Sequence, residues 1–348
     1  MLSATLFSRT FTFGFDARTS RGPMRDKKSW FIRLFDTPDV VGVGECGPLP
    51  GLSVDDVPDF EEVLSDVIKK VQGQEVPAEP EEWVARIVPA GFPAITFGLE
   101  TAVLDLIHGG RRLIFDSDFS RGVPIPINGL VWMSDVASML EQASQLVKRG
   151  FTCIKIKVGG CDFEEEYRML RAFRERFSES NITLRLDANG AFSPEEALAK
   201  LDRLAEFGVH SIEQPVKAGS AGLADICRSS PIPIALDEEL IGKEQEKGAL
   251  LDKIKPGFIV LKPTLHGGLL HCRQWIGEAE HRGIGWWITS ALESSIGLNA
   301  IAQFVAMFNP AVPQGLGTGS IYTNNIASPL KVVGGSLMSH PHGAWEGL

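Results

Sequence analysis

The sequence has few cysteines and no long apolar run. Its 348 residues include 5 cysteines, which are scattered and form no Cys-x-x-Cys pair. We therefore expect reduced thiols in a cytoplasmic protein, with neither a disulfide framework nor a zinc site. No apolar stretch approaches the roughly 20 residues that a membrane span needs, and no basic stretch followed by an apolar core opens the chain. We expect no membrane segment and no secretion signal.

Basic residues are also too few for a nucleic-acid-binding protein. The 44 acidic residues outnumber the 34 basic ones, which gives a net charge of -10. A nucleic-acid binder usually carries a basic domain or stripe. The composition is otherwise that of a globular protein, with 44% hydrophobic and 22% charged residues. The length predicts two domains, or one large barrel with a smaller unit.

The first third of the chain predicts strands followed by helices, an α+β domain over residues 1–120. The expected strands cover 6–16, 30–36 and 40–45, and the expected helices cover about 56–72, 80–88 and 94–109. Between the first two strands, residues 19–29 are polar and highly charged and contain glycine and proline. We expect an exposed mobile loop there that closes over the site.

From Pro124 onward, strands and helices alternate. The expected strands are 125–128, 153–158, 183–188, 211–213, 234–238, 258–262, 286–290 and 314–318. Eight such steps predict a (β/α)8-type TIM barrel over residues 121–318. An open doubly wound sheet is the main alternative, but it more often has a glycine-rich phosphate turn after its first strand. We expect residues 319–348 to return to the N-terminal capping domain and complete it.

Charged residues occupy strands that should be apolar. Lys155 and Lys157 alternate with two isoleucines, so both lysines share one face of their strand. An amphipathic strand with a solvated lysine face would explain this pattern in isolation. In a parallel barrel, however, the isoleucines face the helices and the lysines face the barrel interior, where they need nearby anions.

Three acids supply those anions at regular spacing. Asp187, Glu213 and Asp237 end successive strands and lie 26 and 24 residues apart, about one βα unit each. Each acid alone could belong to a turn or a solvated strand end. Together they predict one level at the carboxyl end of the barrel, where active sites lie. Such an oxygen site suits Mg²⁺.

A further lysine completes the pattern. Lys262 follows the next strand, 25 residues after Asp237, at the end of a mostly apolar run. A surface lysine at a strand exit would be unremarkable, but in the barrel it lies across the mouth from Lys157. Two lysines beside a metal-bound carboxylate suit proton removal next to that carboxylate.

These motifs resemble the enolase superfamily, in its muconate-lactonizing-like subgroup, and most closely the o-succinylbenzoate synthases. The motifs that carry the resemblance are KIK (155–157), LRLDANG (184–190), SIEQP (211–215), ALDEE (235–239) and VLKP (260–263). Supporting motifs are SRGPMRDKK, GECGPLPGLS (44–53), INGLVWM (127–133) and SALESSIGL (290–298). The resemblance covers nearly the whole chain.

The resemblance implies a role for each of these positions. Lys157 is the acid/base catalyst, with Lys155 beside it, and Lys262 stabilises an enediolate from the opposite face. Asp187, Glu213 and Asp237 bind Mg²⁺, for which Mn²⁺ can substitute, and Asn189 supports that site. The implied reaction is the syn dehydration of 2-succinyl-6-hydroxy-2,4-cyclohexadiene-1-carboxylate, a small-molecule carboxylate, to o-succinylbenzoate, a step toward menaquinone.

The substrate pocket leaves alternatives open. Related enzymes racemise N-succinylamino acids or epimerise dipeptides with the same residues, and dipeptide epimerases commonly carry an acidic DxD segment after the eighth strand. Here residues 315–320 contain no acid. A neutral pocket suits a dianionic substrate, so Ser290, Ser294, Gly315 and Gly317 are candidates for holding the succinyl carboxylate. A barrel that binds ligand without catalysis is the remaining alternative.

Overall fold

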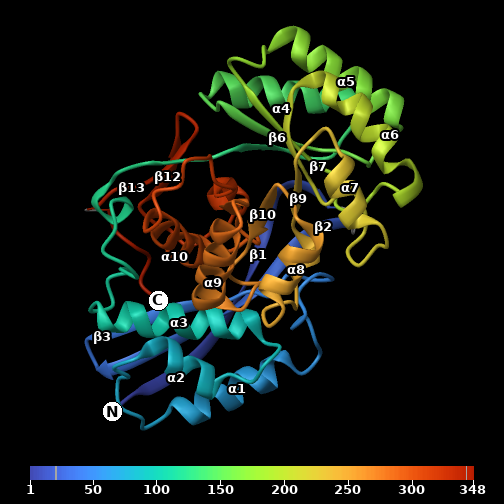
Figure 1. Cartoon of the computed structure of the whole chain (residues 1–348). Coiled ribbons are helices and arrows are strands. Elements are labelled where there is room, and N and C mark those ends of the chain that lie inside the picture. Colours follow the sequence, from blue (N-terminus) through green and yellow to red (C-terminus); the bar gives the residue numbers. More distant parts are fainter. Residues whose placement is uncertain (20–21, 342) are drawn as a thin grey trace.

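The computed structural model describes residues 1–19, 22–341 and 343–348. An antiparallel sheet near the N-terminus packs with helices to form a cap, and a curved parallel sheet forms most of a barrel beside it (Figure 1). The cap sheet has the order β1 (Ser3–Thr19), β2 (Gly22–Thr37) and β3 (Val40–Cys46). The first two strands form a long ribbon, because they pair from Ser3 with Phe35 to Thr19 with Gly22.

The expected loop over 19–29 is wrong for Thr19, which ends β1, and for residues 22–29, which belong to β2. Residues 20–21 lie outside the described residues. The charges of this segment suggested a loop, but they are also compatible with a strand. Alternate side chains of a strand face opposite ways, so a strand can expose charged residues on one face and bury others on the opposite face. Most of the charged ones face solvent, whereas Lys27 and Ser29 are buried. Any movement of this segment stays a prediction.

Three helices pack on the cap sheet: α1 (Phe60–Val71), α2 (Pro80–Ile87) and α3 (Pro93–Ile107). The predicted helical spacing of apolar residues in α1 is confirmed, since Phe60, Leu64 and Val67 are buried. Helix α3 is buried on most sides because it lies against both the cap sheet and barrel helix α9 (Gly268–His281). A side chain at Gly44 would lie 1.8 Å from the Gly98 carbonyl oxygen, so this close approach requires glycine.

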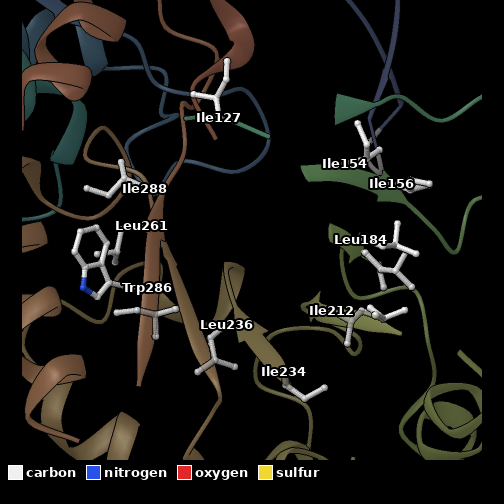
Figure 2. Packing of buried hydrophobic residues seen from close by; sticks show 14 of the residues in the cluster. Ile127, Ile154, Ile156, Leu184, Ile212, Ile234, Leu236, Leu261, Trp286 and Ile288 are labelled. Carbon is white, nitrogen blue, oxygen red and sulfur yellow. The ribbon is translucent and has the colours of Figure 1, made fainter. Parts of the chain in front are cut away.

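The predicted barrel is confirmed as a parallel sheet with helices on its outer face. In the described ranges its seven strands are β5 (Gly129–Val131), β6 (Cys153–Lys157), β7 (Thr183–Asp187), β8 (Val209–Glu213), β9 (Ile234–Leu236), β10 (Phe258–Leu261) and β11 (Gly285–Ile288). The helices are α4 (Val136–Lys148), α5 (Phe163–Arg176), α6 (Pro194–Leu204), α7 (Leu223–Ser229), α8 (Lys247–Ile254), α9 (Gly268–His281) and α10 (Ser295–Ala306). Short 3-10 turns cover Phe119–Arg121, Ala205–Phe207, Glu238–Leu240 and Gly317–Ser320. Outward-facing strand residues such as Ile154, Ile156 and Leu184 pack in one core cluster with helix residues (Figure 2).

The first and last barrel strands differ from the expected ones. Residues 125–128 are not the first strand, because β4 (Ile125–Pro126) pairs with β13 (Ser336–Ser339) and the barrel begins at β5. Residues 314–318 are not a regular strand either. Gln314 and Gly315 form single parallel bridges to Ile127 and Thr289 and so connect the two edges of the sheet. The chain turns away directly afterwards, so too few residues remain in register to form a ladder.

The C-terminal segment crosses back over the molecule. Strands β12 (Leu330–Val333) and β13 (Ser336–Ser339) form an antiparallel sheet with β4. Tyr322 bridges Phe13 of β1, and Arg9 of β1 forms an ion pair with Glu346 at 2.6 Å. No helix in the described part of the chain has the length and apolar character to span a membrane.

Candidate active site

The acids and lysines lie at one end of the barrel because of the strand register. Lys157 of β6 pairs with Asp187 of β7, and Asp187 pairs with Glu213 of β8. Glu213 pairs with Ala235 of β9, so Asp237, two residues further on, directly follows that strand. Neighbouring parallel strands in this register bring the three carboxylates to the carboxyl end of the sheet.

Each carboxylate contacts a lysine. Lys155 Nζ donates to Glu213 Oε2 at 2.5 Å and lies 3.0 Å from Asp187 Oδ2. Lys157 Nζ donates to the same Asp187 oxygen at 3.0 Å and to Asn189 Oδ1 at 2.6 Å. On the other side of the row, Lys262 Nζ donates to both oxygens of Asp237, with 2.6 Å to Oδ2. The lysines therefore approach the acid row from two sides.

Burial and charge act in opposite directions on these groups. Burial lowers the pKa of Lys155, but the carboxylates of Asp187, Glu213 and Asp237 outweigh it, so its pKa lies above the ordinary value. The same balance raises the pKa of Lys262 beside Asp237. Burial would raise the pKa of Asp187, yet Lys155 and Lys157 hold it low. Burial raises the pKa of Glu213, and the neighbouring carboxylates add to this effect.

The residues fit a hard divalent cation by their chemistry. Their donors are carboxylate oxygens, the ligands that Mg²⁺ prefers. Within the described residues, Glu213 Oε1 and Glu238 Oε2 are buried and have no hydrogen-bond partner, and a cation would satisfy such oxygens. No three His, Cys, Asp or Glu side chains in those ranges already converge closely enough to hold a metal ion. Lys155 Nζ instead bridges the two acids, at 3.0 Å from Asp187 Oδ2 and 2.5 Å from Glu213 Oε2.

A cavity of about 340 Å³ opens over this row. It is lined by Lys155, Lys157, Lys262, Asp187 and Asp237, together with Asn189, Ser290, Gly315 and Gly317. Glu213 is fully buried and contributes no lining. The cap supplies an apolar wall through Phe15, Leu49 and Leu52. The cavity therefore combines a charged floor with an apolar cover, as small-molecule sites usually do.

Ser294, a predicted substrate contact, is buried and does not line the cavity. Its hydroxyl donates to Glu45 Oε2 at 2.6 Å, and the same oxygen atom of Ser294 caps helix α10 by accepting from the Ile296 N–H. Ser290 does line the cavity, although its hydroxyl donates to Glu293 Oε2 at 2.5 Å. Small polar residues near a strand end looked alike in the sequence, and only the packing separates their roles.

The sequence reasoning missed Glu238 and the apolar cover. Glu238 lines the cavity and accepts from Asn189 Nδ2 at 3.0 Å, which connects it to Lys157 through Asn189. Burial raises the pKa of Glu238, and adjacent Asp237 adds to this shift. The second acid of ALDEE was a visible signal. Leu49 and Leu52 also lie within a quoted motif, GECGPLPGLS, whose position over the cavity could not be read from the chain.

Fold and site together define a class: an enzyme with a capped (β/α)8-type barrel whose lysines and carboxylates suit acid–base chemistry on a small carboxylate. A family model described as "Enolase C-terminal domain-like" matches residues 138–342. The chain is 44% identical to the o-succinylbenzoate synthase of Desulfotalea psychrophila, over 92% of this chain and 94% of that protein. It is 30% identical to the o-succinylbenzoate synthase of Thermosynechococcus vestitus, over 86% and 87%. The chain belongs to the o-succinylbenzoate synthase family of the enolase superfamily.

Solved structures agree with this family. The crystal structure of MenC from Desulfotalea psychrophila LSv54 matches with a TM-score of 0.86 at 41% identity and covers 97% of this chain and 99% of that chain. The L-Ala-D/L-Glu epimerase from Bacillus subtilis matches with a TM-score of 0.85 at 20% identity, over 97% and 95%. The second similarity concerns the fold alone.

Proposed function

We propose that this protein is an o-succinylbenzoate synthase, a lyase that removes water from 2-succinyl-6-hydroxy-2,4-cyclohexadiene-1-carboxylate on the path to menaquinone. The observation that carries the proposal is that Lys157 and Lys262 flank the acid row and line one cavity with Asp187 and Asp237. The apolar cover suits the carbon ring of such a substrate. Neutral Gly315 and Gly317 suit its second carboxylate better than an ammonium group.

In this proposal Lys157 moves the proton. Its Nζ takes the proton from the carbon next to the substrate carboxylate and then gives a proton to the departing hydroxyl on the same face. Asn189, which accepts from Lys157 Nζ, orients this amine. Lys262 places its positive charge beside the enediolate oxygens from the opposite face. The product is aromatic, so the overall reaction is downhill.

Asp187, Glu213 and Asp237 would hold Mg²⁺, with Mn²⁺ as a substitute. When bound, the ion supplies positive charge to the substrate carboxylate and so makes the neighbouring proton more acidic. The orphaned Glu213 oxygen supports this proposal. We place the activity in the cytoplasm, since Cys46, Cys153, Cys161, Cys227 and Cys272 are all free thiols.

A domain division accompanies the proposal. We propose a cap over residues 1–120, a barrel over 121–318 and a segment over 319–348 that completes the cap. The Arg9–Glu346 ion pair supports the last of these assignments.

Racemisation of N-succinylamino acids is a second candidate activity of the same site. Its support is that Lys157 and Lys262 approach the acid row from opposite sides, and a racemase needs one base on each face. Dehydration uses one face and needs one base.

An absorbance assay tests the proposal. Purified protein with Mg²⁺ is mixed with the cyclohexadiene substrate, and a panel of N-succinylamino acids is tested beside it. We expect rapid dehydration that Lys157→Met abolishes. Lys69→Met, on an exposed side chain of α1, is the control and should match the unmodified protein. Absence of dehydration alongside fast racemisation would replace the main proposal with the second.

A further inference from the structure

A buried charged cluster joins the cap to the wall of the cavity. Lys27 of β2 is 1% exposed, and Glu45 of β3 and Glu293, which follows β11, are both 0% exposed. None of the three is among the described residues that line the cavity, and the proposed chemistry uses none of them. Three ionisable groups buried this completely are costly unless their charges compensate one another.

The two glutamates bind the chain around the loop between β11 and α10. Glu45 accepts from the Ser294 N–H at 3.0 Å and from the Gly297 N–H at 3.0 Å, so a cap residue holds the first turn of a barrel helix. Glu293 accepts from the Ser290 hydroxyl at 2.5 Å and from the Ala291 N–H at 2.8 Å. Glu293 thereby holds two residues that line the cavity.

Two glycines show that the three charged groups share one space. A methyl group at Gly47 would lie 2.5 Å from Lys27 Nζ and 3.4 Å from Glu45 Oε1. A methyl group at Gly297 would lie 3.0 Å from Glu45 Oε2 and 2.7 Å from Glu293 Cβ. Lys27 also donates to Ser29 Oγ at 3.2 Å. Lys27 and Glu45 thus border the same glycine, and Glu45 and Glu293 border another.

The loop that these groups hold is strained. Leu292 has a φ of 64°, in the left-handed region that leucine rarely adopts. Its N–H donates to Ser290 Oγ at 3.0 Å, and its carbonyl accepts from the Tyr322 hydroxyl at 2.7 Å. A backbone in this conformation persists only where its surroundings impose it. Ser290, Ala291 and Leu292 all line the cavity, so the loop's shape is part of the substrate pocket.

We propose that Lys27 is a positioning residue for the reaction: its ammonium compensates the charges of Glu45 and Glu293, and Glu293 then keeps Ser290–Leu292, through the hydrogen bonds that it accepts, in the shape that receives the substrate. The cap thereby sets the geometry of a barrel loop from behind the cavity. This inference rests on the proposed function for its activity readout.

The test is a charge-compensation cycle. Lys27→Met keeps the length of the side chain but leaves two buried glutamates without their cation. Lys27→Met/Glu293→Gln removes one of those negative charges as well. Lys28→Met, at the next position of the same strand, is the matched control because its side chain is 43% exposed. We measure kcat and KM for dehydration with Mg²⁺ from pH 6 to pH 9.

We expect Lys27→Met to lose about 10²-fold in kcat/KM at pH 8.5, the order of loss that a misplaced pocket causes. The loss should shrink toward pH 6, because Glu293 without Lys27 takes up a proton more easily and the cluster again carries less charge. The double variant should recover most of the activity and lose the pH dependence. Lys28→Met should behave as the unmodified protein.

Equal activity of Lys27→Met and the unmodified protein overturns the inference, and so does an equal defect in the single and double variants at every pH. A single variant that fails to fold while the double variant folds supports charge compensation. Hydrogen exchange at residues 291–294 supplies an independent readout. These amides should exchange faster in Lys27→Met than in the double variant, whether or not the unmodified protein dehydrates the cyclohexadiene. Inactivity of the unmodified protein on the cyclohexadiene would refute the proposed function but not this inference.

Discussion

Replacing the two lysines that flank the acid row should separate their roles in stability as well as in catalysis. Asp187 contacts both Lys155 and Lys157, each at 3.0 Å. Lys157→Met therefore leaves Asp187 with a cation, and we expect a stability change within about 1 kcal/mol. Within the described residues, Asp237 has its ion pair with Lys262 alone, and it is 2% exposed. Lys262→Met leaves that buried charge unpaired.

An unpaired buried charge of this kind costs about 3–5 kcal/mol. For a chain of this length that corresponds to a fall in Tm of about 4–7 °C. The fall should appear without Mg²⁺ and diminish when Mg²⁺ is added, since Asp237 is a proposed ligand. Thermal unfolding of the two variants, with and without Mg²⁺, measures this difference. Equal Tm values for the two variants without Mg²⁺ would refute the reasoning from the ion pairs.

The catalytic effects of the same variants should differ in kind. Lys157→Met should lose about 10²–10⁴-fold in dehydration rate, the usual contribution of a general base. Lys262→Met should lose about 10²–10³-fold, as when one charge-stabilising group is removed. In D₂O with an N-succinylamino acid, Lys262→Met should lose exchange of only the enantiomer whose proton faces Lys262. Near-normal dehydration by Lys157→Met would show that the base assignment is wrong.

Three further predictions concern the metal, the pH dependence of stability and the N-cap of helix α10. Mg²⁺ at about 100 times its Kd should stabilise the protein by about 2.7 kcal/mol, and Asp187→Asn should remove most of this protection in a thermal shift assay. Burial raises the pKa of Glu100, which accepts from the Leu269 N–H at the start of α9, to about 8. The pKa of Glu100 in the folded protein lies above its unfolded value of about 4.5, so the protein loses stability as the pH rises between these two values. Glu100→Gln should therefore raise the Tm at pH 8.5 relative to the unmodified protein. At pH 4.5 the same substitution should change the Tm little. Ser294→Ala should lower the free energy of unfolding by about 1–2 kcal/mol in denaturant titrations, because the variant loses the helix N-cap and the hydrogen bond to Glu45. A changed KM with an unchanged free energy of unfolding would instead show that Ser294 contacts the substrate.

The level of the acid row could be predicted because it depends on a regular repeat. Parallel strands one βα unit apart pair in nearly constant register, so spacing along the chain becomes height in the barrel. Alternation within a strand likewise assigned Ile154 and Ile156 to the helices and Lys155 to the interior, as the core packing and cavity have it. These are local or periodic properties, and the residues themselves carry them.

Irregular pairing could not be predicted in the same way. Whether residues 22–29 form a loop or a strand depends on β1 running alongside them, and their charges are compatible with both. The barrel edges at 125–128 and 314–318 depend on competition from β13 and on where the chain turns away. The secondary-structure propensity of a short segment is a weaker influence than its pairing with a strand that is distant in the sequence.

The sequence by itself determined the barrel, its carboxylate row and the lysines that flank it, because periodicity and spacing encode them. Only the tertiary structure decided which side chains meet across the two domains. Lys27, Glu45 and Glu293 come from segments separated by up to 266 residues, and Ser294 differs from Ser290 only in what the fold brings against it. Contacts between distant segments leave no period in the chain, so they arise from packing and charge compensation once the domains have met.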